Sequence, residues 1–246
     1  MSTKTWALFL LLIGALLSAD AKPKPKLLVF SKTMGFRHDC IPVGKLAMIK
    51  LGSENGFEVD TTEDASVFTP DNLKQYAAIM FLCTTGNVLD DAQQTAMEGY
   101  IRNGGGFMGI HAATDTEYDW PWYNKLVGAW FLSHPKQQEA TLLVVDRKNA
   151  ATAHLPEKWV RKDEWYNFKD LNPDVHVLIK IDETSYEGGK NGDNHPMCWY
   201  HDFDGGRAFY TEMGHTKESY ADPLYLKHVL GGIRYAMGTG HGKKKA

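Results

Sequence analysis

The feature of this sequence that most constrains the fold is the alternation of short apolar runs with helical segments through the first half of the chain. The apolar runs predict buried strands over residues 27–31, 57–61, 77–82 and 107–110. A helix is predicted over residues 40–55, because Gly56 is a favourable residue just past its end. A second helix is predicted over residues 90–103, with Asp90 as its N-cap. Strands separated by helices of this length form βαβ units, so we expect a parallel sheet with helices on both faces.

The second half of the chain is less regular. Strand-like segments occur at residues 140–145, 175–182, 197–202 and 207–211, with irregular polar stretches between them. A closing helix is predicted over residues 223–237, because proline suits the first position of a helix. No repeat or low-complexity block interrupts the pattern. We therefore predict one domain over residues 22–238 with an elaborated second half, followed by a disordered basic tail over residues 239–246.

The first 21 residues have the features of a signal peptide. Lys4 precedes an apolar run over residues 6–17, and Ala19-x-Ala21 has the small-residue spacing of a signal-peptidase site. Twelve apolar residues are too few to span a bilayer comfortably, and nothing later in the sequence has that character. The sequence predicts an exported protein, periplasmic or secreted, with no integral membrane segment after signal cleavage. The alternative is an uncleaved anchor.

Charge and cysteine usage narrow the classes of partner. The formal net charge is −3, so no global field favours nucleic acid or an anionic membrane. The three cysteines, Cys40, Cys83 and Cys198, leave at least one free thiol, and their wide spacing offers no CxxC metal clip. We expect them to be buried small apolar residues.

The strongest chemical signal lies at the end of the predicted strand over residues 107–110. There the sequence ends in G-x-H-x-A, with only small residues around His111. Where a buried strand turns sharply into a helix, small neighbours leave one side chain exposed at the carboxyl edge of the sheet, as in the nucleophile elbow of hydrolases. Ligands of open parallel sheets bind at that edge. His111 is a poor acyl carrier but a good base, acid or metal ligand, unless it is instead a histidine satisfied within the core.

Several motifs resemble the signature of the ThuA-like (trehalose utilisation) family. The elbow reads GGGFMGIHAATDT, and it is followed by WPWY at 120–123 and an L-x-G-x-x-F-x-x-H-P pattern over 126–135. Further matches are G-F-R-H at 35–38, D-E-x-Y at 163–166 and R-x-F-Y-x-x-x-G-H at 207–215. The motifs follow the family's order and cover residues 27–238, nearly the whole mature chain.

This resemblance implies a fold similar to the class I glutamine amidotransferases. That fold is a flavodoxin-like α/β sandwich with a mainly parallel central sheet, and the family implies a link to sugar catabolism. In those amidotransferases the elbow residue is a cysteine, and a His/Glu pair follows a late strand. Here His111 stands at the elbow, which excludes thiol-based glutamine hydrolysis. The late histidine is retained as His215, with Glu212 three residues before it.

The predicted catalytic residues are His111, His134, His215, Glu164 and His38. His38 lies in a loop after the first strand that should open onto the same edge, or it caps a helix. His134 precedes Pro135, which favours extended backbone in a loop. Glu164 lies in a stretch of mixed charge and aromatic residues, where the alternative is a solvated surface acid.

The predicted substrate-binding residues are Asp115, Trp120, Trp122 and Tyr166. Asp115 can orient the His111 ring or bind a substrate hydroxyl, and the alternative is an N-cap. The tryptophans can present flat faces to a sugar, or they can close the core over the sheet. The histidines without a motif, His154, His176, His228 and His241, are predicted to lie at the surface.

Together these residues favour an exported enzyme that acts on small-molecule sugars or 3-keto-glycosides by histidine-based acid–base chemistry, as a lyase or hydrolase. A ketone at C3 acidifies the C2 proton, so a base (His111 or His134) can remove that proton and the C1 substituent can leave. Neither HExxH nor H-x-E…CxxC spacing is present, so a divalent metal would have to be held by residues from distant loops. Whether one is bound stays open. Two alternatives also stay open: a non-catalytic carbohydrate-binding or interaction domain, and a metal-dependent hydrolase of another substrate.

Overall fold

The computed structural model describes residues 23–239. The predicted signal peptide and residues 240–246 of the predicted tail, with His241, lie outside the described residues. Within residues 23–239, no helix has both the length and the apolar character needed to cross a membrane.

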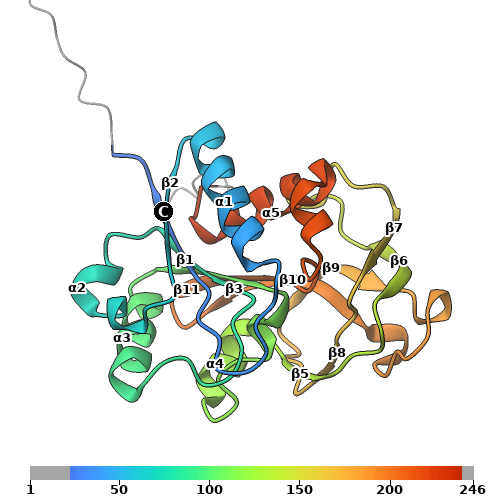
Figure 1. Ribbon diagram of the computed structural model, residues 1–246, viewed down its shortest axis with the longest axis horizontal. Helices are drawn as coiled ribbons and strands as arrows, with labels where there is room; N and C mark the ends of the chain where they lie inside the picture. The colour runs from blue at the N-terminus through green and yellow to red at the C-terminus, as the bar shows by residue number, and fades with distance from the viewer. Residues whose placement is uncertain (1–22, 240–246) are drawn as a thin grey trace, which may run out of the picture.

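A nine-stranded sheet runs through the whole described chain, in the order β2-β1-β3-β4-β11-β10-β9-β6-β7 (Figure 1). Its strands are β1 (Lys26–Phe30), β2 (Glu58–Thr62), β3 (Ala78–Leu82), β4 (Gly106–Ile110), β6 (Gln138–Val144), β7 (Lys158–Asp163), β9 (His176–Ile181), β10 (Pro196–Phe203) and β11 (Gly206–Thr211). Strands β2, β1, β3, β4 and β11 are parallel to one another, and from β11 onward β10, β9, β6 and β7 extend the sheet by antiparallel pairing. A separate two-stranded sheet pairs β5 (Trp130–Ser133) with β8 (Asn167–Lys169).

Helices cover both faces of the parallel half, as the sequence predicts. The helices are α1 (Ile41–Asn55), α2 (Pro70–Leu73), α3 (Asp91–Arg102), α4 (Pro121–Val127) and α5 (Pro223–Ala236). Helices α1 and α5 contact each other on one face, while α2, α3 and α4 lie on the other (Figure 1). The five parallel strands therefore form the middle of a three-layer α/β sandwich.

Local sequence signals account for several of these boundaries. Helix α1 ends at Gly56, whose φ of 79° is the left-handed conformation that glycine adopts without a Cβ clash. Helix α3 begins with a capping box, in which Asp90 accepts from the Gln93 backbone and the Gln93 side chain accepts from the Asp90 backbone. Strand β4 is buried at every position. A Cβ at Gly106 would overlap the backbone carbonyl of Ala236, so this glycine lets α5 pack directly on the strand.

Several elements carry no clear signal in the sequence. Helices α2 and α4 are one to two turns long, and β5 and β8 have four and three residues. Strand β7 is an edge strand with four charged residues among its six, so it has no apolar run. Three cysteines were expected to be buried, and all three are buried free thiols.

Candidate functional site

His111 lies directly after β4, at the carboxyl end of a central parallel strand, as predicted. Its φ is 49°, a strained conformation for a residue with a side chain, and a short 3₁₀ turn rather than an α-helix follows it. The expectation that the elbow side chain stands exposed is wrong: His111 is 0% exposed. Loops from both halves of the chain close over it, so the elbow points into a covered cluster.

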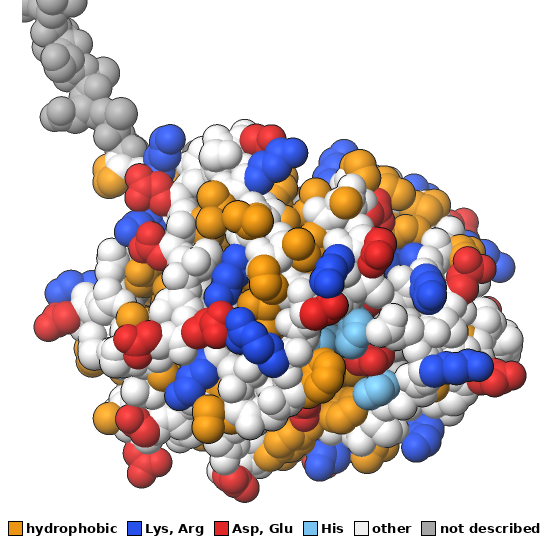
Figure 2. All heavy atoms as spheres, viewed as in Figure 1, with side chains coloured by type: hydrophobic (Ala, Val, Ile, Leu, Met, Phe, Trp, Pro, Cys, Tyr) orange, Lys and Arg blue, Asp and Glu red, His pale blue; other side chains and the backbone are white. Residues whose placement is uncertain are grey.

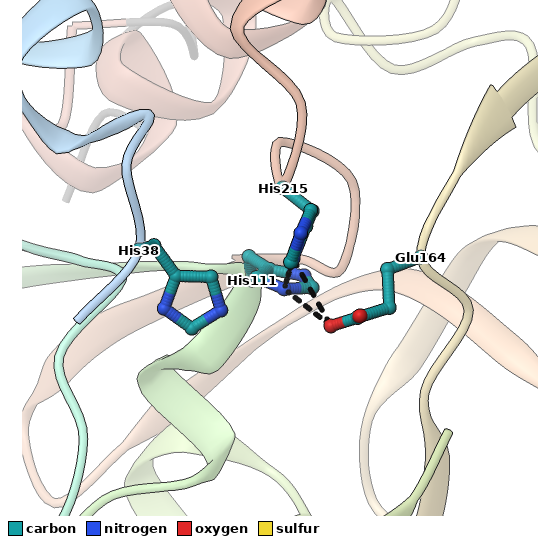
Figure 3. Close-up of side chains that lie close together, drawn as sticks. All are labelled: His38, His111, Glu164 and His215. Carbon is teal, nitrogen blue, oxygen red and sulfur yellow. Dashed lines mark hydrogen bonds and ion pairs between the residues drawn. The ribbon is translucent and has the colours of Figure 1, made fainter. Parts of the chain in front are cut away.

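Four titratable side chains converge at this point, each from a different loop (Figure 3). His38 comes from the loop between β1 and α1, Glu164 follows β7, and His215 follows β11. One ligand atom from each of these and from His111 lies within 4.8 Å of all the others. Nε2 of His111 faces two members of this cluster, with Nδ1 of His215 at 3.0 Å and Oε2 of Glu164 at 3.4 Å.

The protonation of the His111 ring follows from its other nitrogen. Nδ1 of His111 lies 2.8 Å from the backbone carbonyl oxygen of Glu212, which can only accept, so Nδ1 donates. Nε2 is therefore the nitrogen that faces His215 and Glu164. The backbone carbonyl of Glu212, and not Asp115, orients this ring.

Buried carboxylates determine the charge of the cluster. Burial opposes charge on His111, but the Glu164 and Glu212 carboxylates outweigh it and raise its pKa to about 10. Burial also opposes charge on Glu164, but His111 and His215 hold its pKa well below the usual range. Burial raises the pKa of Glu212 to about 7. Burial and the neighbouring imidazoles lower the pKa of His38 to about 2, so that ring is neutral.

Asp163 fixes the loop that carries His215. Its fully buried carboxylate accepts hydrogen bonds from the backbone N–H groups of Gly214 and His215, both at 3.1 Å, and from the Ser219 hydroxyl at 3.2 Å. Asp163 also precedes Glu164 in the chain. The end of β7 therefore both supplies one member of the cluster and holds another in place. This role was not predicted, although Asp163 belongs to the D-E-x-Y motif.

His134 lies outside the buried cluster but is joined to it through Glu164. Its Nδ1 is 3.3 Å from Glu164 Oε1 and 2.8 Å from the backbone carbonyl of Pro135. Because that carbonyl can only accept, Nδ1 carries the proton and Nε2 is left with a free lone pair. The side chain is 42% exposed. Glu164 thus turns one oxygen to the buried imidazoles and the other to an exposed one.

Tyr166 forms one wall of this site. Its ring is buried and packs on those of His111 and Phe131, with both centroid distances 4.3 Å. Its backbone N–H donates to Glu212 Oε1 at 3.0 Å. Tyr166 therefore lies beside the imidazoles, and its role in substrate binding stays a prediction.

The other three predicted substrate-binding residues are placed differently. Asp115 accepts a hydrogen bond from the Tyr118 hydroxyl at 2.6 Å, and neither an N-cap nor a bond to His111 is observed for it. Trp120 and Trp122 stack on each other, and Trp122 donates to Asp204 in the turn that precedes β11. That turn is at the amino edge of the parallel strands, opposite the histidine cluster. These tryptophans therefore close the core, which is the second of the two alternatives that the sequence left open.

Two exposed apolar residues in the loop that carries His38 were not predicted. Met34 and Phe36 are 64% and 67% exposed, and the Phe36 ring contacts the His38 ring edge-on at 4.9 Å. Figure 2 shows histidine side chains reaching the surface of this face among hydrophobic and acidic ones. The only available signal was the G-F-R-H motif, which places Phe36 two residues before His38.

The fold and this site define an α/β protein with the class I glutamine amidotransferase-like fold, in which a histidine stands at the elbow. The profile of the ThuA (trehalose utilisation) family matches residues 26–236, and the chain belongs to that family.

Solved structures agree with this assignment. A ThuA-like protein from Bacteroides uniformis is 25% identical with a TM-score of 0.73, and the match covers 88% of this chain and 93% of that one. A ThuA-like protein from Parabacteroides merdae is 21% identical with a TM-score of 0.69, and the match covers 90% of this chain and 93% of that one. A β-galactosidase from Bacillus circulans sp. alkalophilus shares the fold at 11% identity and a TM-score of 0.59, over 89% of this chain but 32% of that one. A comparison with curated proteins gives no match.

Proposed function

We propose that this chain is an enzyme of carbohydrate catabolism that acts on sugars oxidised at C3 by acid–base elimination. The observation that carries the proposal is the division of the site by Glu164, with buried imidazoles on one side and the half-exposed His134 on the other. The family's description as trehalose utilisation supports a sugar as the substrate.

The chemistry requires a base and a group that holds the developing enolate. His134 is the proposed base, because in the neutral ring Nε2 has the free lone pair, and the Pro135 carbonyl and Glu164 fix the ring through Nδ1. It takes the C2 proton, the C1–C2 double bond forms, and the C1–O bond breaks, so that the departing alkoxide takes up a proton. The buried cluster around His111 supplies positive charge for the C3 oxygen, either as a protonated imidazole or by holding a cation.

Turnover of 3-keto-glycosides tests this proposal, with the unoxidised glycosides as comparison substrates. We expect the wild type to convert only the oxidised sugars, and His134→Ala to lower the rate by about 10²–10⁴-fold, as is typical when a general base is lost. His176→Ala is the matched control, because His176 is an exposed histidine paired with a carboxylate, Asp146, at 2.9 Å. Full activity of His134→Ala would place the base elsewhere. Binding of 3-keto-glycosides without turnover by the wild type would instead identify a non-catalytic carbohydrate-binding domain.

His111→Ala is a less discriminating variant. An exposed elbow side chain would contribute little to packing, but His111 is fully buried between two carboxylates. Its removal takes an imidazole from both carboxylates. Glu164 keeps His215 and His134, but among the described residues the buried Glu212 carboxylate keeps only the Tyr166 backbone N–H. Breaking a buried ion pair costs about 3–5 kcal/mol. We therefore expect this variant to lose stability as well as activity, whereas the exposed His134 can be removed with little effect on folding.

A further inference from the structure

We propose that His111, His215 and Glu164 bind a divalent first-row transition-metal cation, with His38 as a fourth ligand. Three donor atoms already form a triangle. Nδ1 of His215 is 3.0 Å from Nε2 of His111 and 3.0 Å from Oε2 of Glu164. The third side of the triangle, from Nε2 of His111 to Oε2 of Glu164, is 3.4 Å. All three atoms are nitrogen or oxygen atoms of a kind that binds a cation, and they face one another; His111 would release its Nε2 proton when the cation binds.

The size of the triangle matches a small cation. Zinc binds imidazole nitrogen and carboxylate oxygen at about 2.0–2.2 Å, which sets neighbouring donors about 3.0 Å apart in an octahedron and about 3.4 Å apart in a tetrahedron. Calcium takes six to eight oxygen ligands at about 2.3–2.6 Å, so two imidazoles do not suit it. Imidazole with one carboxylate is a donor set typical of zinc, iron and related cations.

The groups behind these donors also suit a metal centre. The N–H of a metal-bound imidazole usually donates to a carbonyl or a carboxylate, and Nδ1 of His111 donates to the Glu212 carbonyl. The backbone of His215 is held by Asp163, and the second oxygen of Glu164 is held by His134. All three donors are therefore oriented by partners that leave the triangle free.

His38 provides the second, independent observation. The residue is 3% exposed, and neither ring nitrogen has a hydrogen-bond partner among residues 23–239, with Nδ1 fully buried. Its ring lies 4.9 Å from that of His111 and 5.0 Å from that of His215, and in Figure 3 one of its nitrogens points toward them. A buried imidazole without a partner is unfavourable. One nitrogen of His38 lies within 4.8 Å of the ligand atoms of the other three residues, so His38 is placed to join them at the same ion.

The cation gives the proposed reaction its electrophile. A metal held by these side chains keeps coordination positions for substrate oxygens, and it would polarise the C3 carbonyl while His134 removes the C2 proton. This catalytic part rests on the proposed function, whereas the binding of the metal does not.

The binding is measured on the full mature chain without a histidine tag, after treatment with a chelator. Titration with Zn²⁺ by calorimetry, and with Co²⁺ by its visible absorption, should give one equivalent per chain. Glu164→Gln and His215→Asn should each weaken binding by more than about 10–100-fold, the range found even for changes behind the ligands. His176→Asn, which removes an exposed histidine beside a carboxylate, should bind as the wild type does.

Each outcome separates the two proposals. No stoichiometric binding by the wild type, or unchanged affinity in Glu164→Gln, would overturn the metal site. Turnover of 3-keto-glycosides by metal-free protein would keep the proposed function and reject the catalytic role of the metal. One tightly bound equivalent without any turnover would keep the metal site and reject the proposed function. Melting curves of each variant without metal show whether it is folded, and His38→Asn, which leaves the triangle intact, should weaken binding less than His215→Asn does.

Discussion

His111 and His228 are both fully buried, but their partners give them different charge states, with His111 positively charged and His228 neutral. His111 lies between two carboxylates, which raise its pKa to about 10 when no cation is bound. His228 was expected at the surface, yet it lies inside α5, where burial lowers its pKa to about 4. Its Nδ1 donates to the Ala151 carbonyl at 2.9 Å, and its Nε2 lies 3.1 Å from the Thr211 hydroxyl, from which it accepts. His228 is therefore neutral, with both nitrogens satisfied.

The neutral state of His228 makes stability depend on pH. Its folded-state pKa of about 4 is below the ordinary value of 6.5, so the unfolded chain takes up the proton first as the pH falls. The stability that neutral His228 adds to the folded state is fully present above pH 6.5. It is lost as the pH falls through about 4, and the total loss is about 3 kcal/mol. His228→Asn cannot be protonated, and we expect its free energy of unfolding to fall less steeply over this window. Urea unfolding at a series of pH values measures the difference.

His176→Asn serves as the control for that measurement, because His176 is exposed. Parallel curves for the wild type and His228→Asn would show that His228 is not the group responsible.

Strand β4 is closely packed against helix α5. It is buried along its whole length, and Gly106 touches the end of α5. Helix α5 also carries His228, and it covers the same face of the sheet as α1. The position of β4 in turn decides where His111 lies, so the packing of α5 and the geometry of the site are connected.

Two glycine substitutions test this packing. Gly106→Ala introduces a Cβ that overlaps the Ala236 backbone, and overpacking of this kind costs about 1–3 kcal/mol or more. Gly99→Ala in α3 is the matched control, because no atom lies within 4 Å of its added Cβ, and alanine should stabilise the helix by about 0.5–1 kcal/mol. Chemical denaturation of both variants should therefore give changes of opposite sign. If Gly106→Ala left the free energy of unfolding unchanged, α5 would be able to shift without loss of stability.

For the whole molecule, the antiparallel extension of the sheet completes the site. Strands β7, β6, β9 and β10 add to one side of β11, and the end of β7 brings Asp163 and Glu164 over His111. A parallel sheet alone would carry His111, His38 and His215 without the carboxylate between them. The elaborated second half therefore changes the chemistry available at the edge of the sheet.

The location of the protein is a separate prediction. We propose that it is exported and that the mature chain begins at Lys22, because Ala19-x-Ala21 ends the apolar run. Intact-mass measurement of the exported protein should show the loss of residues 1–21. Ala19→Asp disrupts the small-residue spacing, so this variant should keep residues 1–21 and show the higher mass of the uncleaved chain. Retention of residues 1–21 by the wild type would contradict the prediction.

The sequence by itself determined the parallel half of the fold and the place of His111. Local patterns carry this information, since apolar runs of strand length, Gly56 and the Asp90 cap act through neighbouring residues. Edge strand β7 left no such pattern, because four of its six residues are charged, and the buried one among them, Asp163, has its partners Gly214, His215 and Ser219 far away in the sequence. The family motifs marked His38, Glu164 and His215, but only the tertiary structure decided that they share one cluster, that His111 is covered, and that Trp120 and Trp122 lie at the opposite edge. The reason is physical: contacts between loops depend on how the strands are ordered in the sheet, and no single stretch of sequence encodes that order.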